Sequence, residues 1–327
     1  QLTTSQNPWS ESAAWPELKS VSLLGKNRQY FTYNEWTGDI VDGVRNADIF
    51  SVNAERHSAD TLPYESVEKA FCGARGCKPE CSRYYKLLTG ENQPWKLTVY
   101  KSAADAEDDG TAGEFYKPDY EGDRKPYTGK NKVCTCSEAD YACGWKDVTL
   151  PASWQMQGFD FPIYTNIEYP WIGAYGNEGS DKDSLVPVSP KVTNPVGFYR
   201  RYFDVDSDWL ENGKKVFITF RGVESAMYLY INGHEVGYTE DSYDSHEFDI
   251  TPFLNPDGKE NLLAVRVHRW CSGSWGENQD FLRLAGIFRD VFVYAVPAVH
   301  IRDYKVETDL DGGFVNADLK LKLNVSN

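Results

Sequence analysis

One stretch of the chain gathers the residue types that could do chemistry. Five such side chains crowd into a single loop: Trp270, Trp275, Asn278, Asp280 and Arg283. Aromatic faces cover the apolar C–H patches of a pyranose ring, and planar polar groups form hydrogen bonds with its hydroxyls. This combination of tryptophan, carboxylate and amide therefore indicates a surface that binds a sugar.

Two strand-like runs must position this loop. In the first, residues 263–268, aliphatic side chains alternate with Ala, Arg and His, and this period of two predicts a half-buried strand. In the second, residues 289–294, Val291 and Val293 share one face and Phe292 and Tyr294 share the other. The connection is too long for a hairpin turn, and long ordered loops in compact domains often carry function.

Short alternating runs recur along the chain from residue 197 onward. They are residues 197–205, 216–220, 226–232, 235–241 and 247–250. Asn232-Gly233 predicts a tight hairpin turn between two of them. Short strands joined by close turns predict an all-β fold, an antiparallel β-sandwich with long loops.

Earlier segments are less regular. Residues 95–100 predict the first sandwich strand, and the small acidic residues 102–114 predict a solvated, flexible loop. Residues 150–170 are predicted as loop because Asp160 and Pro162 interrupt them. At the other end, residues 301–327 predict two further strands around a turn that begins at Asp311.

Composition bounds the partners. The 327 residues carry a net charge of −15, from 49 acidic and 34 basic residues, so a nucleic-acid backbone would be repelled. A hydrophobic fraction of 41% is ample for a globular core, and the length suits one large domain or two ordinary ones. Apolar runs are too short to cross a membrane.

The cysteines fall into two clusters and one isolated residue, Cys271. The clusters are Cys72, Cys77 and Cys81, and then Cys134, Cys136 and Cys143. Disulfides, free thiols and a zinc site all remain open, although the spacing is irregular and a nearby histidine is lacking. Disulfides would imply an oxidising compartment, and the chain opens at Gln1 without a signal sequence. We therefore expect a secreted or cell-surface protein, with a cytoplasmic one as the alternative.

Several sequence blocks carry a family resemblance. RW, SGSW, ENQD and LAGIFRDV follow one another within residues 269–291. Four further blocks are GFYRRYFDV (197–205), FRGVESAMYLYINGHEVGY (220–238), EFDITPFL (247–254) and LPASWQMQGFDFPIYTNIEYP (150–170). In this order they resemble the N-terminal sugar-binding jelly roll of the family 2 β-galactosidases. The resemblance covers roughly residues 45–300.

The resemblance implies a domain plan. Residues 1–44 would form an N-terminal arm, and 45–297 the jelly-roll domain, with Cys-rich insertions near 67–85 and 123–144. Residues 298–327 would be the truncated start of an immunoglobulin-like domain. The insertion at 123–144 departs from the family pattern, as does Ser153, where the family usually has Asn. We expect the six clustered cysteines to pair as three disulfides, with at least one joining the two insertions.

The resemblance also carries over two site residues. Asn166 would bind galactosyl hydroxyls, and Asp280 would accept a hydroxyl and ligate a Na+ that touches the sugar. The plainer alternatives are a loop-capping role for Asn166 and a salt bridge from Asp280 to Arg283 or Arg289. Trp270 and Trp275 suit the core or loop support better than a sugar platform. Cys271 is expected to be an inert buried thiol.

Function follows from the resemblance as an expectation. The intact protein would hydrolyse terminal β-D-galactosides with retention, using two glutamates and Mg2+ on a (β/α)8 barrel that this segment lacks. The segment alone is then expected to be inactive. Its partners would be the substrate, the rest of the same polypeptide and a second copy in a homo-oligomer. The alternatives are a free-standing carbohydrate-binding module and a relative of β-glucuronidases or β-mannosidases.

Overall fold

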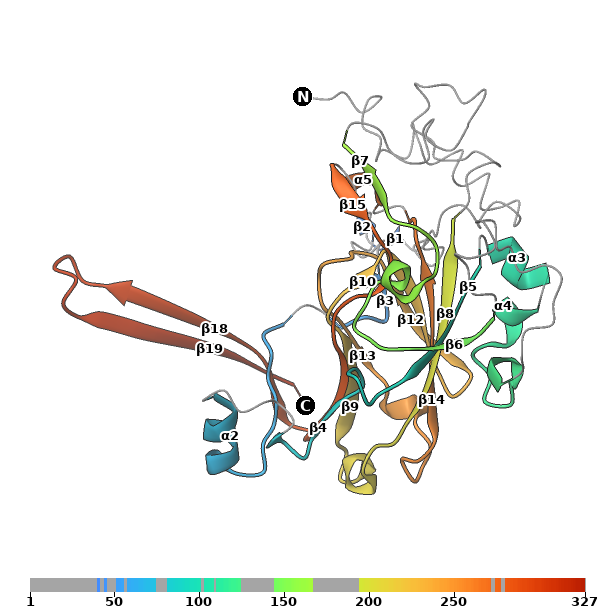
Figure 1. Cartoon of the computed structure of the whole chain (residues 1–327). Coiled ribbons are helices and arrows are strands. Elements are labelled where there is room, and N and C mark those ends of the chain that lie inside the picture. Colours follow the sequence, from blue (N-terminus) through green and yellow to red (C-terminus); the bar gives the residue numbers. More distant parts are fainter. Residues whose placement is uncertain are drawn as a thin grey trace.

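The structure is a computed structural model of the whole chain. It describes residues 40–41, 44–45, 51–55, 58–74, 81–100, 103–108, 110–124, 144–166, 194–271, 274–277 and 280–326. Antiparallel strands make up most of the regular secondary structure of the described residues, as the sequence predicts, and Figure 1 shows these strands gathered into one main body with a hairpin projecting from it. The all-β fold class is therefore confirmed, and the jelly-roll connectivity stays a prediction.

Two antiparallel sheets form the body. The larger has the strand order β3 (Ser51–Val52), β12 (His234–Thr239), β11 (Ala226–Ile231), β14 (Asn261–His268), β8 (Val196–Phe203), β5 (Trp95–Tyr100) and β6 (Lys146–Val148). The smaller has the order β13 (His246–Asp249), β9 (Lys215–Phe220), β17 (Val291–Val296) and β4 (Tyr85–Leu87). Both edges of each sheet are therefore formed by short strands.

Short strand pairs and helical turns complete the described part of the chain. The pairs are β1 (Ile40–Val41) with β2 (Val44–Arg45), β10 (Val223–Glu224) with β16 (Gly286–Ile287), β7 (Ile163–Thr165) with β15 (Phe281–Arg283), and β18 (His300–Leu310) with β19 (Ala317–Ser326). The α-helices are α2 (Val67–Ala74), α3 (Ala103–Asp108), α4 (Thr111–Glu114) and α5 (Ser274–Glu277). The 3-10 turns are η2 (Gly122–Arg124), η3 (Trp154–Gln157), η4 (Ser207–Leu210) and η5 (Thr251–Phe253).

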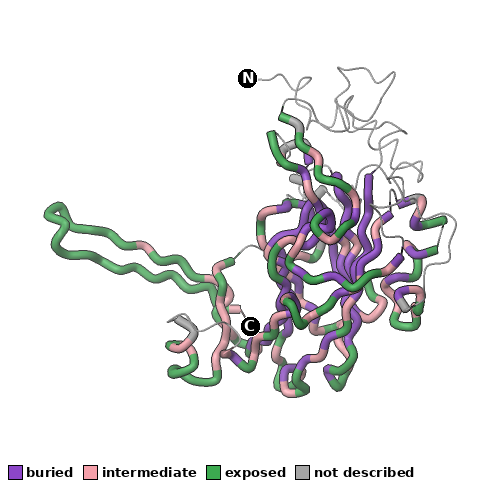
Figure 2. The backbone as a smooth tube through the Cα atoms, viewed as in Figure 1, coloured by how far each residue is buried: buried purple, intermediate pink, exposed green. Residues whose placement is uncertain are grey.

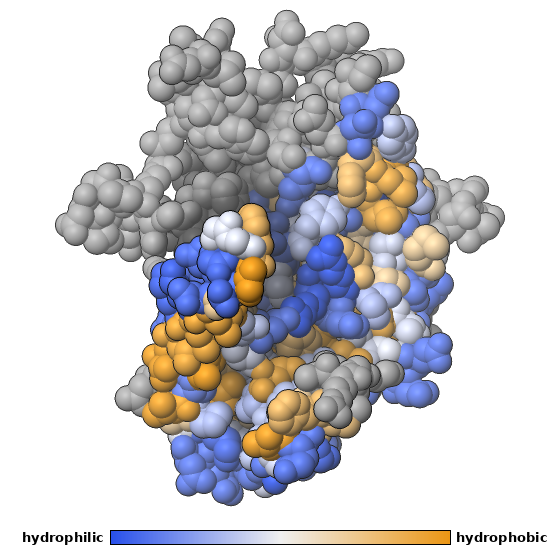
Figure 3. Space-filling view, turned by 90° about the vertical axis from the view of Figure 1, so that its left-hand side faces the viewer, coloured by the Kyte–Doolittle hydropathy of each residue, from blue (hydrophilic) through white to orange (hydrophobic). Residues whose placement is uncertain are grey.

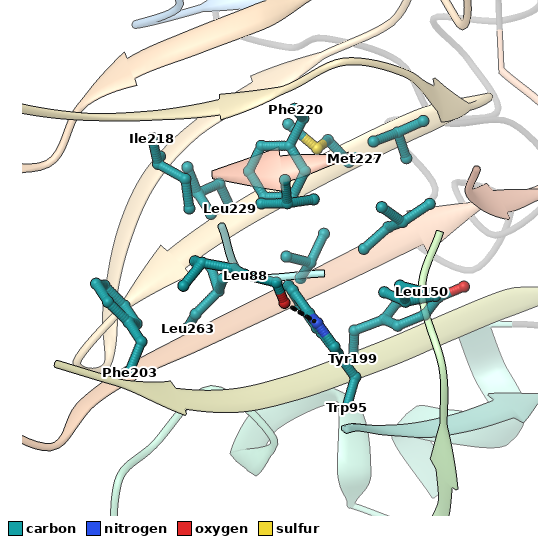
Figure 4. Close-up of a cluster of buried hydrophobic side chains, with 14 of the residues drawn as sticks. Leu88, Trp95, Leu150, Tyr199, Phe203, Ile218, Phe220, Met227, Leu229 and Leu263 are labelled. Carbon is teal, nitrogen blue, oxygen red and sulfur yellow. Dashed lines mark hydrogen bonds between the residues drawn. The ribbon is translucent and has the colours of Figure 1, made fainter. Parts of the chain in front are cut away.

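The main core lies between the two sheets. Alternate residues of facing strands fill it, including Leu263 of β14, Leu229 of β11 and Ile218 of β9, all fully buried. Figure 4 shows these side chains interdigitating with Trp95 and Leu88, and the Trp95 Nε1–H donates to the Leu88 carbonyl at 2.8 Å. Because each large side chain contributes about 1.5–3 kcal/mol on burial, this cluster dominates the stability of the sandwich.

The outer face of the larger sheet is also covered. Phe115, which follows α4, packs on Phe198 of β8 and Tyr230 of β11, with ring centroids 4.7 and 5.4 Å apart. Residues 102–114 were predicted as a solvated loop, and this is wrong because α3 and α4 form there and bury Ala103 and Ala106 against the sheet. Small residues such as these alanines let a helix pack closely on a sheet. The acidic residues between them made the segment look like a solvated loop.

This second layer changes the character of β14. Its alternating residues predicted a half-buried strand, but Ala264 and His268, on the outward face, are buried as well. Arg266 on the same face is intermediate in exposure, and its guanidinium lies 4.1 Å from the centroid of the Tyr228 ring. A strand covered on both faces cannot be recognised from its own period.

A buried ion pair ties the covering layer to the sheet. The Arg200 Nε lies 3.0 Å from Asp123 Oδ2, and both side chains are almost completely buried. The same guanidinium donates to the carbonyls of Phe115 and Lys117. This arginine therefore anchors the segment from α4 to η2 on β8.

Local predictions met mixed outcomes. The Asn232-Gly233 turn is confirmed, because both residues have the positive φ angles (50° and 86°) that the turn between β11 and β12 requires. Residues 95–100 form a strand, but β3 and β4 precede it, so it is not the first of the sandwich. Residues 150–170 were predicted as loop, yet η3 and β7 lie within them because β15 supplies a partner strand for β7.

The hairpin of β18 and β19 projects away from the sandwich (Figure 1) and is exposed along most of its length (Figure 2). Its turn is closed by Asp311, whose carboxylate accepts the N–H of Val315 at 2.9 Å. One face carries only apolar or small residues apart from Thr308: Ile301, Tyr304, Val306, Leu310, Ala317, Leu319, Leu321, Leu323 and Val325. Figure 3, viewed from the hairpin's side, shows hydrophobic patches next to hydrophilic ones.

Helices in the described part of the chain are short, and none is long and apolar enough to cross a membrane.

The prediction of six paired cysteines is only partly compatible with the structure. Cys81 is a free thiol, so this part of the prediction is wrong, because a disulfide requires a second sulfur placed at bonding distance. Cys72 is disulfide-bonded, and Cys77, Cys134, Cys136 and Cys143 lie outside the described residues, so the rest of the pairing stays a prediction.

Candidate functional site

A short ribbon brings the two predicted site residues together. Strands β7 and β15 pair antiparallel, with Phe281 opposite Thr165 and Leu282 opposite Tyr164. Asp280 immediately precedes Phe281 and Asn166 immediately follows Thr165, so the same register places them across from each other at the ribbon's tip. Both residues are exposed. Residues from two distant loops thus meet at one end of the sandwich (Figure 1).

Asp280 is exposed to solvent and forms no ion pair with the two arginines nearest to it in the sequence. Its φ angle of +48° is in the left-handed region, which Asp tolerates better than bulkier residues. Arg283 is 1% exposed and Arg289 donates to the Tyr243 carbonyl at 2.6 Å, and within the described ranges Asp280 forms an ion pair with neither. The alternative of a salt bridge is therefore wrong for this structure.

Tyr164 is a site residue that the sequence reading missed. Its hydroxyl donates to Asp280 Oδ1 at 2.8 Å, and its ring is 62% exposed on the ribbon. This hydrogen bond raises the pKa of the Tyr164 hydroxyl, since ionisation would place a second negative charge beside the carboxylate. The signal was present in the sequence. Tyr164 lies two residues before Asn166 on a strand, and such residues share a face.

Beneath the ribbon lies a buried charged group. The Arg269 guanidinium forms an ion pair with the Asp160 carboxylate, and their side chains are 1% and 3% exposed. Trp154 Nε1 and Gln155 Nε2 each donate to the same carboxylate at 3.3 Å. The negative charge of Asp160 is therefore fully compensated inside the protein.

Trp270 supports this group and is not a sugar platform. It is 1% exposed, and the Arg269 guanidinium carbon lies 4.9 Å from its ring centroid. The side-chain amide of Asn194 donates to the Trp270 carbonyl at 2.8 Å and accepts its backbone N–H at 2.9 Å. The side chain of Trp275 and all of Asn278 lie outside the described residues.

Two carboxyls, the buried Glu224 and the half-buried Glu277, flank the ribbon's attachment. Glu277 of α5 accepts hydrogen bonds from the backbone N–H and hydroxyl of Ser242, at 2.7 and 2.8 Å. Burial raises the pKa of Glu277, and burial raises the pKa of Glu224 to about 8 even though Arg269 acts against the rise. Glu224 also accepts the backbone N–H of Leu284, just after β15. These carboxyls fix the loop at both ends of the segment that carries Asp280.

Cys271 sits beside this group as an inert thiol. It is completely buried and unbridged, and burial raises the pKa of its thiol well above the usual value. A protonated, inaccessible thiol is a poor nucleophile and a poor metal ligand. The prediction that Cys271 is a buried, unbridged thiol is therefore confirmed.

The geometry suits binding of hydroxyl groups. Asp280 offers acceptor oxygens, Asn166 offers both donors and an acceptor, and the exposed ring of Tyr164 offers an apolar face beside them. Three hollows in the described part of the molecule, of about 800, 230 and 1210 Å³, are lined by other residues. Among the described residues the ribbon tip is thus an exposed edge that lies outside these three hollows.

Comparisons with known proteins agree with this reading. The family model described as "Glycosyl hydrolases family 2, sugar binding domain" matches residues 92–297. The chain belongs to this family of glycoside hydrolases and contains its sugar-binding domain. A β-galactosidase of Priestia megaterium is 36% identical over 295 residues, which cover 90% of this chain and 24% of that protein.

Other relatives extend the comparison. A β-galactosidase of Clostridium acetobutylicum is 36% identical over 285 residues, covering 87% of this chain and 27% of that protein. A solved β-glucuronidase from an uncultured Clostridium species aligns with a TM-score of 0.44 and 19% identity, covering 74% of this chain and 34% of that one. The chain spans about a quarter of the length of the curated relatives named here.

Proposed function

We propose that this chain is the N-terminal sugar-binding domain of a β-galactosidase that hydrolyses terminal β-D-galactosides with retention. The observation that carries the proposal is the ribbon tip, where Asn166 and Asp280 lie opposite each other and exposed. The names of the full-length relatives supply the substrate class. In this proposal the two residues hold the galactosyl ring, while two glutamates on another domain of the same polypeptide break the bond.

A Na+ ion at Asp280 fits the chemistry of the tip. A carboxylate is a hard oxygen ligand, and the Tyr164 hydroxyl occupies only one of the two oxygens of Asp280. Among the described residues no group of three or more His, Cys, Asp or Glu could hold a metal. Asp280 would therefore supply one ligand, and further oxygens would come from the sugar, water or another domain. Mg2+ belongs to the proposed catalytic domain.

The projecting hairpin supports a further domain in the same polypeptide. Two strands alone cannot bury their apolar face, and the side chains of Leu319 and Leu321 are 72% and 58% exposed. We assign residues 298–327 to the start of an immunoglobulin-like domain that would cover this face. Its base is fixed to the sandwich by Arg302, whose Nη1 lies 2.8 Å from Glu247 Oε1.

The proposal is tested on the intact polypeptide with nitrophenyl β-galactoside, β-glucuronide and β-mannoside. We expect turnover of the galactoside alone. In the Asp280→Asn variant, loss of a charge-assisted interaction worth roughly 1.5–3 kcal/mol should lower kcat/KM by at least about tenfold and weaken the response to Na+. Asp119→Asn, an exposed carboxylate beyond α4, is the matched control. Unchanged kinetics in Asp280→Asn at limiting Na+ would refute the assignment.

The 327-residue chain alone should show no hydrolysis in the same assay. If the intact polypeptide also binds galactosides without turning them over, the chain belongs to a carbohydrate-binding module instead. A preference for the glucuronide or mannoside would move the assignment to those branches of the family.

A further inference from the structure

The ribbon that carries the site has little packing of its own. Strands β7 and β15 are three residues long, and Tyr164 and Leu282 are 62% and 49% exposed. Isolated two-stranded ribbons of this size are marginal in water. The position of Asn166 and Asp280 must therefore be fixed from the ribbon's base.

One guanidinium lies at that base and contacts both the loop that leads into β7 and the last residue of β15. Arg269 Nη2 donates to the Phe161 carbonyl at 3.0 Å, two residues before β7 begins. The same nitrogen donates to the carbonyl of Arg283, the last residue of β15, also at 3.0 Å. Nη1 is engaged by the Asp160 carboxylate. A planar group with several donors is needed to hold these acceptors together, and Lys cannot replace it.

Stability alone is a poor explanation for this arrangement. Burying an ion pair costs about as much in desolvation as the pair returns, and apolar replacements of similar volume are often neutral. Arg269 and Asp160 are nevertheless almost fully buried beneath an exposed ribbon. Arg269 immediately follows β14, and Asp160 lies in the loop before β7. The pair's distinctive result is geometric, because it joins the loop before β7 to the end of β15, two segments that are distant in sequence.

We infer that Arg269 is a positioning residue: by bonding Asp160 and the carbonyls of Phe161 and Arg283, it fixes the β7–β15 ribbon and so places the sugar-binding tip. The inference deepens the proposed function and rests on it for the identity of the ligand. The mechanical part, that Arg269 orders the ribbon, stands on the hydrogen bonds alone. Arg269 does not touch the sugar.

The experiment compares Arg269→Lys with Arg200→Lys in the intact polypeptide. Arg200 is an equally buried arginine paired with Asp123, and it anchors α4 and η2 rather than the ribbon. Hydrogen exchange should accelerate by roughly tenfold or more in peptides covering 160–166 and 280–284 of Arg269→Lys. Peptides from β8 and β14 should change much less. In Arg200→Lys the ribbon peptides should exchange as in the parent protein.

Kinetics give the second readout. Misplacing the tip should raise KM for nitrophenyl β-galactoside roughly tenfold in Arg269→Lys, with a smaller change in kcat, whereas Arg200→Lys should keep both values. If Arg269→Lys does not fold, Asp160→Asn removes only the charge of the partner and is expected to loosen the same peptides. Unchanged ribbon exchange in a folded variant, or equal loosening in Arg200→Lys, would overturn the inference.

The two proposals fail separately in this design. If Asp280→Asn leaves catalysis intact, the proposed sugar contact is wrong, while the exchange result still decides the role of Arg269. If Asp280→Asn impairs catalysis and Arg269→Lys changes neither KM nor exchange, the positioning role is wrong and the sugar contact stands.

Discussion

Glu224 should make the stability of this domain pH-dependent. It lies on β10 and is 6% exposed, and its pKa is raised to about 8 from a usual 4.5, chiefly by burial. Arg269 and Arg283 oppose the rise, and Glu277 reinforces it. The carboxyl is therefore mostly protonated at neutral pH. Tyr243, whose own pKa is raised by burial, also faces this carboxyl.

The sign follows from proton linkage. Because the pKa of Glu224 is higher in the folded state, the folded protein binds this proton more tightly between pH 4.5 and 8. The stabilisation is full below pH 4.5 and is lost as the pH rises through about 8. A rise of this size corresponds to at most about 5 kcal/mol of unfolding free energy.

Urea denaturation of the parent and of Glu224→Gln from pH 5 to 8.5 isolates this contribution, because the amide does not titrate. The free energy of unfolding of the parent, relative to Glu224→Gln, should fall by a few kcal/mol, up to about 4, across the range. Glu91→Gln, at an exposed turn, is the control for loss of a solvated carboxyl. A constant difference between parent and Glu224→Gln over this range would refute the reasoning, because the carboxyl would then titrate alike in the folded and unfolded chains.

Three further outcomes are expected. Trp95→Ala should lower the free energy of unfolding by about 3–5 kcal/mol in urea denaturation, since it empties the core and removes the bond to Leu88, while Tyr304→Ala should change it little. Thiol titration should find Cys81 reactive in the folded protein and Cys271 reactive only after denaturation, and equal rates would contradict the burial. The 327-residue chain alone should self-associate through the apolar hairpin face. Light scattering should show less association in Leu321→Glu than in the parent chain. Lys322 lies on the opposite face of the hairpin, so an equal decrease in Lys322→Ser would refute association through the apolar face.

The sequence determined what depends on neighbouring residues. A period of two identified β8, β11, β14 and β17, because alternate side chains of a strand face opposite sides. The Asn232-Gly233 turn followed from the positive φ that Gly and Asn accept. Sequence blocks around Asn166 and Asp280 indicated the family, which the comparisons confirm. The roles of those two residues in sugar and Na+ binding stay proposals.

Tertiary structure decided what depends on distant partners. The pairing of Thr165 with Phe281 brings the two site residues together, and no local pattern specifies a register between segments so far apart. Helices α3 and α4 form because the outer face of the larger sheet offers an apolar surface, which their acidic composition could not reveal. The hydrogen bonds of Arg269 likewise depend on three separate segments meeting, since the carbonyls of Phe161 and Arg283 lie beside Arg269 only once the chain has folded.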